Sequence, residues 1–288
     1  MIIVLLIFIA IERLCFWETK GFRLHKIVSA LPYDSQWESV NPPADISALL
    51  NQPYFFIGSG GTCYSFVSQD GQTVIKFFKH QHLLPNRRLK CLPGFLDTLL
   101  INWSLAKEKQ FAHKRIDFLF KSCKIAHDEL KNQTGIIHLQ LNKSPKFKQN
   151  LILYDKIGCR HTIDLSNTEF VLQKRATLVY DLLKQWQKEG NIEKSQRCID
   201  QILSLIIDRH KRGIADRDPN VEINFGMADN RIIEIDVGSF SRVTTARPLN
   251  EELASSTLEF QEWLGMQYPE LQTYLKIQIA SYEPIPKL

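Results

Sequence analysis

The sequence contains six cysteines but no Cys-x-x-Cys pair. They stand at positions 15, 63, 91, 123, 159 and 198, so that neighbours are 28 to 48 residues apart. A zinc site, or the disulfide framework of a small secreted domain, needs cysteines at short and regular spacings. We therefore expect neither, and the pattern indicates a reducing, cytoplasmic compartment.

The net charge of the chain is also small. Lys and Arg total 36 against 31 Asp and Glu, which gives a formal net charge of +5 at pH 7 over 288 residues. This mild excess suits a protein that handles an anionic nucleotide or a sugar phosphate, and no nucleic-acid partner is expected from it. A content of 44% hydrophobic and 23% charged residues is typical of a globular chain with one two-lobed unit or two modest domains.

No hydrophobic run is long enough to predict a membrane-spanning helix. Residues 1–11 are strongly apolar, but Glu12 and Arg13 interrupt the run well short of the ~20 residues that a spanning helix needs. The basic region and the small-residue cleavage site of a secretory signal are missing as well. Three interpretations remain: a membrane-surface anchor with Phe16 and Trp17 at the interface, a helix packed on the domain, or a start codon placed too far upstream. The first predicts weak membrane-surface association through residues 1–17.

A glycine-rich turn lies between two apolar, strand-like runs. Residues 57–67 read Ile-Gly-Ser-Gly-Gly-Thr-Cys-Tyr-Ser-Phe-Val, and Gly71 then introduces Thr73-Val74-Ile75-Lys76-Phe77. The pattern predicts two strands joined by a tight loop, then a turn and a third strand that carries Lys76. Glycines let backbone N–H groups approach phosphate oxygens, and a lysine on the third strand can reach them. The alternative is an ordinary hairpin turn.

Acidic and amide side chains end two short strand-like runs further along. Residues 213–218 read Gly-Ile-Ala-Asp-Arg-Asp, Asn224 follows, and Ile233-Glu234-Ile235 precedes Asp236-Val237-Gly238. A phosphoryl-transfer site needs one carboxylate to orient a hydroxyl, and amide and carboxylate oxygens to hold magnesium against nucleotide phosphates. The order of these residues indicates such a site.

These motifs resemble those of protein-kinase-like phosphotransferases. Asp216-Arg217-Asp218 resembles the His-Arg-Asp of the kinase catalytic loop, and Asp236-Val237-Gly238 resembles its Asp-Phe-Gly. The glycine loop, the lysine strand, a long helix, strands, helices and the acidic motifs follow in kinase order over about residues 55–240. The resemblance implies an α+β, two-lobed protein-kinase-like fold, with a small β-rich N-lobe that includes a long helix and a larger helical C-lobe. We expect residues 1–50 to form a lead-in, 51–157 the N-lobe and 158–288 the C-lobe.

The resemblance also implies roles for individual residues. Asp218 is the expected catalytic aspartate, although a turn-stabilising Asp before Pro219 is the alternative, and Asn224 and Asp236 are the expected magnesium ligands. The expected ATP-binding residues are Gly58, Ser59, Gly60, Gly61, Lys76 and, where the kinase hinge would pass the adenine, Asp155.

Lys76 also needs an acidic partner on the long helix predicted for residues 104–131. Glu108 is the candidate for this catalytic role and Asp117 the rival, and a solvent-facing charge is the alternative for both. The two are nine residues apart, about 180° around a helix, so only one can face Lys76.

Three departures from the kinase pattern are visible. Asn224 follows Asp218 by six residues where kinases have five, which predicts a bulge in the loop. Cys63 stands where the third glycine of the loop is expected, and no Ala-Pro-Glu follows residues 236–238. The last absence argues against a regulated kinase that binds peptides.

The sequence thus predicts an ATP- and Mg²⁺-dependent phosphotransferase acting on a hydroxyl acceptor, whether sugar, lipid or protein. It is closer to bacterial small-molecule and lipopolysaccharide-sugar kinases than to eukaryotic-type protein kinases. A catalytically inactive, pseudokinase-like module that binds a nucleotide or a partner is the alternative, and a membrane-surface scaffold that uses residues 1–17 is a third. Helices are expected from residue 167 or 168 to 188 and from 192 to 211.

Overall fold

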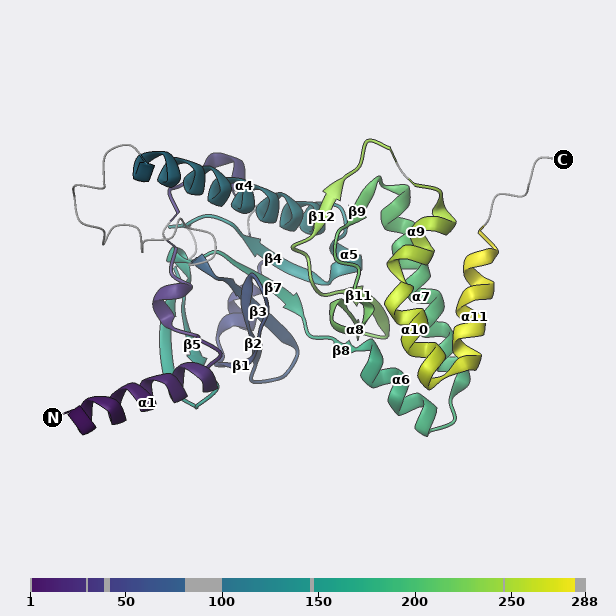
Figure 1. Ribbon diagram of the computed structural model, residues 1–288, viewed down its shortest axis with the longest axis horizontal. Coiled ribbons are helices and arrows are strands. Elements are labelled where there is room, and N and C mark those ends of the chain that lie inside the picture. Colours follow the sequence, from purple (N-terminus) through teal and green to yellow (C-terminus); the bar gives the residue numbers. More distant parts are fainter. Residues whose placement is uncertain are drawn as a thin grey trace. The chain divides into compact units, whose positions relative to one another are not determined.

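The computed structural model describes residues 2–29, 31–38, 42–80, 100–145, 148–245 and 247–282, with the backbone alone for residues 2–3 and 100–110. It divides into two compact units (Figure 1). The first comprises Met1–Phe120 and Ile137–Arg175, and the second comprises Lys121–Ile136 and Ala176–Leu288.

A seven-stranded sheet forms the first unit, with the strand order β4-β7-β3-β2-β1-β5-β6. Its strands are β1 (Tyr54–Ser59), β2 (Cys63–Ser68), β3 (Thr73–Phe78), β4 (Ile136–Gln140), β5 (Asn150–Tyr154), β6 (Arg160–Asp164) and β7 (Phe170–Lys174). In β2, buried Tyr64 and Phe66 alternate with half-buried residues, because successive side chains of a strand point to opposite faces. The lead-in covers this buried face: the Phe22 ring lies 5.3 Å from that of Tyr64 and 5.2 Å from that of Phe66.

The other face of the sheet meets α4 (Leu100–Asp128). The Phe78 ring of β3 lies 5.4 Å from the Phe120 ring of α4, and Trp37 also packs on Phe120 at 5.4 Å. Short helices α2 (Ile46–Leu50), η1 (Leu24–Lys26) and η2 (Ser35–Trp37) complete the lead-in, and η5 (Leu165–Asn167) joins β6 to β7.

Helix α1 (Ile2–Glu18) is attached to this unit at its C-terminal end (Figure 1). Lys20 and Gly21 have positive φ values of 48° and 72°, which turn the chain sharply after the helix. The Tyr64 hydroxyl then donates to the Gly21 carbonyl at 2.9 Å. No described helix, α1 included, is long and apolar enough to cross a membrane.

The second unit is mainly helical. Its helices are the end of α4, α5 (Lys131–Thr134), α6 (Val179–Lys188), α7 (Ile192–Lys211), α8 (Val221–Asn224), α9 (Leu249–Ser256), α10 (Leu258–Gln267) and α11 (Pro269–Ala280). One small sheet consists of β8 (Thr177–Leu178), β10 (Phe225–Ala228) and β11 (Arg231–Glu234). The other consists of β9 (Ile214–Asp216) and β12 (Phe240–Arg242). Helix α7 begins where the Asn191 side chain accepts from the Lys194 N–H at 3.1 Å and stops before Gly213 at φ 65°. Its apolar stripe, which includes Ile199, Ile202 and Ile206, packs with residues of α9, α10 and α11 in one core.

The predicted α+β class, a β-rich part with a long helix followed by a mainly helical part, is confirmed. The helix expected at residues 192–211 is present as α7, whereas the one expected from residue 167 or 168 begins only at Val179. Residues 170–174 instead form β7, which lies between β4 and β3 in the sheet, because Phe170, Val171 and Leu172 can be buried there on both faces. The first unit therefore reaches Arg175, beyond the boundary at 157/158 expected from the sequence.

Candidate functional site

Asp218 and Asn224 are joined directly in the second unit. The Asn224 side chain is buried, and its amide nitrogen donates to the carbonyl oxygen of Asp218 at 2.8 Å. Between them, the Asn220 side chain accepts from the N–H groups of Glu222 and Ile223 at 3.0 and 3.3 Å and so caps the single turn α8. The interval from Asp218 to Asn224 thus contains the helical turn α8, and the bulge expected from the sequence stays a prediction. The Asp218 carboxylate remains at the exposed end of the loop.

A β-hairpin carries Asp236 to the same place. Strands β10 and β11 pair from Phe225 with Glu234 to Ala228 with Arg231, and Asp229 and Asn230 turn the chain with φ values of 49° and 60°. The Ile235 N–H donates to the Asn224 carbonyl at 2.7 Å, so Asp236 follows directly on this contact. One Asp236 carboxylate oxygen accepts from the Gly238 N–H at 3.1 Å, and the side chain is exposed.

The oxygens presented here are of the kind that Mg²⁺ prefers. The Asn224 amide nitrogen donates to the Asp218 carbonyl, which leaves the Asn224 Oδ1 and the Asp236 carboxylate oxygens to bind a cation. No group of three or more His, Cys, Asp or Glu side chains within the described ranges could hold a metal ion. A magnesium ion bound at these two side chains would therefore need phosphate oxygens and water as its other ligands.

A buried ionic cluster contacts the loop that carries Asp218. The Asp216 carboxylate accepts from the Ser239 hydroxyl at 2.5 Å and from the Asp218 N–H at 3.0 Å, and Arg209 Nη1 lies 3.6 Å from it. Arg209 of α7 is fully buried and also forms an ion pair with Glu234 of β11. Burial lowers the pKa of the Arg209 guanidinium, and the charges of Asp216 and Glu252 oppose that shift. Asp216 therefore links the loop of Asp218 to Ser239 and to Arg209 of α7.

The segment after Asp236 is held by α4. The buried Ser122 hydroxyl donates to the Val237 carbonyl and accepts from the Phe240 N–H, both at 2.7 Å. Sequence reasoning did not single out Ser122, Arg209 or Glu234. For Arg209 a signal was present, because it follows Ile202 and Ile206 at helical spacing and so places a charge on the apolar stripe of α7.

Lys76 lies at the centre of β3 in the first unit. It pairs with Ser65 of β2 and Val171 of β7, and it is half-buried. Because side chains alternate along a strand, Lys76 points to the same face as Phe78, which packs on Phe120 of α4. Asp117 is half-buried and precedes Phe120 by three residues, so it shares that helix face, whereas the Glu108 side chain lies outside the described residues.

The glycine loop joins β1 and β2, and there is open space beside each of its glycines. A Cβ added at Gly58, Gly60 or Gly61 would meet no atom within 4 Å, and none of the three has a positive φ. The Gly60 N–H donates to the Cys63 carbonyl at 3.0 Å, and Ser59 pairs with Tyr64. These glycines are thus not required by the backbone conformation or by the packing of the described chain.

Lys79 contacts the glycine loop, and the sequence did not predict it as a site residue. Its ammonium donates to the Gly60 carbonyl and lies 4.7 Å from the centre of the Tyr64 ring. Burial lowers its pKa.

Asp155 does not lie where the hinge was expected. It stands in the turn between β5 and β6, where its carboxylate accepts from the N–H groups of Ile157 and Cys159 at 3.1 and 2.9 Å and pairs with His161 at 2.9 Å. Strand β5 neighbours β1, whereas β7 neighbours the lysine strand β3. The chain leaves the first unit after Arg175 and not at Asp155, and the adenine-binding role expected for Asp155 stays a prediction.

No protein-family model matches the chain, and no curated protein sequence matches it. Among solved structures it is similar to the complex of Rv3197 with erythromycin from Mycobacterium tuberculosis, at 11% identity and a TM-score of 0.37, over 79% of this chain and 55% of that one. Two structures of WbdD, one described as a bifunctional kinase-methyltransferase, are 14% identical, with TM-scores of 0.33 and 0.31 over 79% and 80% of this chain and 44% and 46% of theirs. The chain spans about half the length of these solved chains. Similarities at such TM-scores do not show which reaction the chain catalyses or what it binds.

Proposed function

We propose that this protein is an ATP- and Mg²⁺-dependent phosphotransferase that acts on a hydroxyl-bearing acceptor. The observation that carries the proposal is the hydrogen bond from the Asn224 amide to the Asp218 carbonyl, next to a hairpin that ends at Asp236. In the proposed site the Asn224 amide oxygen and the Asp236 carboxylate are the cation ligands, and the Asp218 carboxylate is the group that meets the acceptor. Phosphoryl transfer uses these groups in these roles.

Each residue has a separate task in the proposed reaction. Asp218 accepts a hydrogen bond from the acceptor hydroxyl, orients it and takes its proton as the oxygen bonds to the γ-phosphorus, while the bond from that phosphorus to the bridging oxygen breaks and ADP leaves. Asn224 and Asp236 hold magnesium, and Lys76 binds nucleotide phosphates under the glycine loop of residues 58–61. Bound magnesium and ATP supply the transferable phosphoryl group and neutralise its charge. The partner of Lys76 on α4 is Glu108 or Asp117.

Three variants separate catalysis from binding. Asp218→Asn should keep ATP·Mg binding and lose transfer, because this carboxylate contacts the acceptor and not the nucleotide. Asp236→Ala should lose both, and Lys76→Ala should weaken ATP binding. Binding is measured by calorimetry, and transfer by loss of the γ-phosphate of labelled ATP to an acceptor pool from a cell extract.

The same experiment decides between an enzyme and a pseudokinase-like module. A wild-type protein that binds ATP·Mg, but transfers no more phosphate than Asp218→Asn, would remove the catalytic assignment. The irregular Asp218–Asn224 interval and Cys63 in the glycine loop are the features that favour that outcome.

A second proposed function, membrane-surface association, has an observation of its own. The apolar side chains along α1 face solvent, with Val4, Phe8 and Trp17 exposed to 70, 69 and 75%. An apolar helix lying in a bilayer interface would remove this surface from water. The Phe8→Asp variant should co-sediment less with phosphatidylcholine vesicles than wild type. The control Leu258→Asp, at a 56% exposed residue of α10, should not change co-sedimentation, and equal sedimentation of wild type and Phe8→Asp would remove the proposal.

A further inference from the structure

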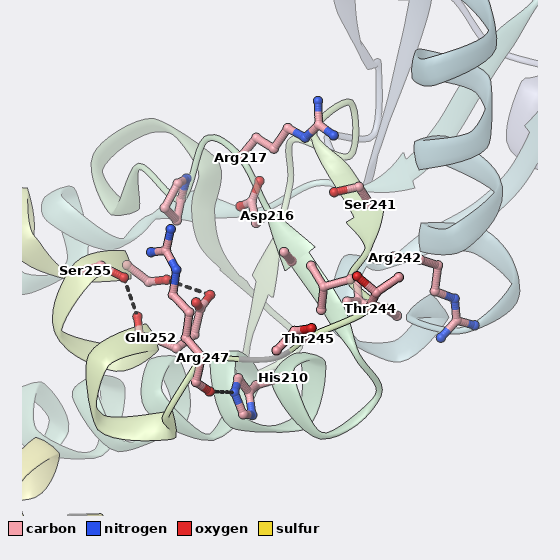
Figure 2. Close-up of a pocket in the computed structure, with 15 residues that line it drawn as sticks. His210, Asp216, Arg217, Ser241, Arg242, Thr244, Thr245, Arg247, Glu252 and Ser255 are labelled. Atoms are coloured by element: carbon pink, nitrogen blue, oxygen red, sulfur yellow. Dashed lines mark hydrogen bonds between the residues drawn. The ribbon is translucent and has the colours of Figure 1, made fainter.

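A cavity of about 700 Å³, lined mainly by polar residues, lies beside the loop of Asp218 and wholly within the second unit. It is formed by β9 and the residues after it, by the segment 241–247 and by α9. Figure 2 shows Arg217 above it, Arg247 with Glu252 and Ser255 on the left, and Thr244 and Thr245 on the opposite side. A cavity of this volume accommodates a small molecule of metabolite size.

The walls of the cavity are held in position by internal bonds. The Val243 N–H donates to the Gly213 carbonyl at 3.0 Å, and His210 Nε2 is 2.8 Å from the Arg247 carbonyl. Arg242 is turned outward, where it donates to the Arg212 carbonyl at 2.8 Å and pairs with Glu129. The segment that carries Arg247 is therefore tied to α7 and to the start of β9.

The cavity has cationic and hydroxyl groups to offer to a ligand. The Arg247 guanidinium makes no hydrogen bond or ion pair with the described residues, and the side chain is exposed. Of the two carboxylates in the lining, Asp216 is already held by Arg209 and Ser239, and Glu252 accepts from Ser256 at 3.3 Å. Hydroxyls of Ser241, Thr244, Thr245 and Ser255 complete the lining.

An oxyanion is the ligand that this lining fits. A guanidinium binds phosphate through two parallel N–H donors, and hydroxyl side chains bind either phosphate oxygens or the hydroxyls of a sugar. The lining also includes Arg217 and Pro219, the residues on both sides of Asp218. A molecule in the cavity would thus lie beside the loop that carries Asp218, whose carboxylate we assign to the acceptor hydroxyl.

We propose that this cavity is the acceptor site and that it binds a phosphorylated sugar, with Arg247 contacting the phosphate. The assignment as acceptor site rests on the proposed phosphotransferase function, whereas the binding of a phosphate at Arg247 does not. The four hydroxyl side chains face the polyol part of the ligand.

Arginine modification by phenylglyoxal tests the proposal on the full chain without nucleotide or magnesium. Mass spectrometry measures the rate at Arg247, with exposed Arg231 and Arg160 as internal controls. Glucose 6-phosphate at about ten times its Kd should slow the reaction at Arg247 about tenfold, inorganic phosphate should also slow it, glucose should not, and the two controls should not respond. Arg217 also lines the cavity, so phosphate should slow its modification in wild type, and the Arg247→Gln variant should lose this protection at Arg217 while its ATP·Mg binding equals that of wild type.

Each outcome decides a separate point. Unchanged modification of Arg247 in saturating phosphate and glucose 6-phosphate overturns the site, even where ATP·Mg binds. Protection by inorganic phosphate alone overturns the sugar-phosphate assignment, because only a small anion then enters. Protection at Arg247 in a protein that neither binds nor turns over ATP·Mg keeps the anion site and overturns the proposed phosphotransferase function.

Discussion

Ser122 on α4 donates its hydroxyl proton to the carbonyl oxygen of Val237 at 2.7 Å. The same hydroxyl accepts from the Phe240 N–H at 2.7 Å, so one buried side chain holds both ends of the segment that follows Asp236. The position of Asp236 therefore depends on a residue more than a hundred positions earlier in the chain.

Ser122→Ala should lower the free energy of unfolding by about 1–3 kcal/mol, because it leaves a buried carbonyl and a buried N–H without their partner. Urea denaturation measures this loss. Ser204→Ala, at an exposed position of α7, is the control and should change stability by less than about 0.5 kcal/mol. Equal stability of the two variants would show that the Ser122 contacts contribute nothing.

Arg209→Met should destabilise the second unit by about 3–5 kcal/mol, because it leaves Glu234 and Asp216 buried without their cation. The double variant Arg209→Met/Glu234→Leu should recover part of the loss, since it removes the uncompensated charge of Glu234. Urea unfolding is again the measurement. In the control Arg197→Met, an exposed pair with Glu193 at 3.5 Å is lost, at a cost of about 1 kcal/mol or less. A double variant less stable than Arg209→Met would contradict the argument.

Gly61→Ala and Gly226→Ala should have opposite consequences. A Cβ at Gly61 meets open space, so the variant should unfold at the wild-type denaturant concentration but bind ATP·Mg more weakly, because the methyl group occupies the path of the phosphates. A Cβ at Gly226 would lie 2.8 Å from the Ala176 Cβ and 2.9 Å from the Thr177 carbonyl oxygen, so that variant should be destabilised. Denaturation and calorimetry on both variants check this, and unchanged ATP affinity in Gly61→Ala would argue against a phosphate-binding loop.

Cysteine alkylation should follow burial and pKa. Burial raises the pKa of the Cys198 thiol to about 12, so near pH 8 it is protonated as well as inaccessible, and only the thiolate reacts. Cys15 and Cys159 are exposed and should react with iodoacetamide in the native protein. Mass spectrometry of the labelled peptides with and without urea tests this, and alkylation of native Cys198 as fast as Cys159 would contradict the core packing around α7.

Elements made by neighbouring residues could be predicted from the sequence. The β10–β11 hairpin follows from two short apolar runs on either side of Asp229-Asn230, which tolerate positive φ. Helix α7 follows from its apolar period, Asn191 at its start and Gly213 after its end. The glycine loop and the lysine strand were predicted for the same reason. Their signals lie within a few residues of the structure that they specify.

Only the tertiary structure decided features that depend on distant neighbours. Residues 170–174 become a strand because β3 and β4, far apart in sequence, leave a place between them, and Asp155 falls in an outer hairpin because β5 pairs with β1. Arg209 contacts Asp216, at the end of the strand that leads to Asp218, and Glu234, because these two residues reach it from two different strands. In each case the free energy of the contact depends on which distant segment is buried against the residue, and the local pattern contains no information about that segment.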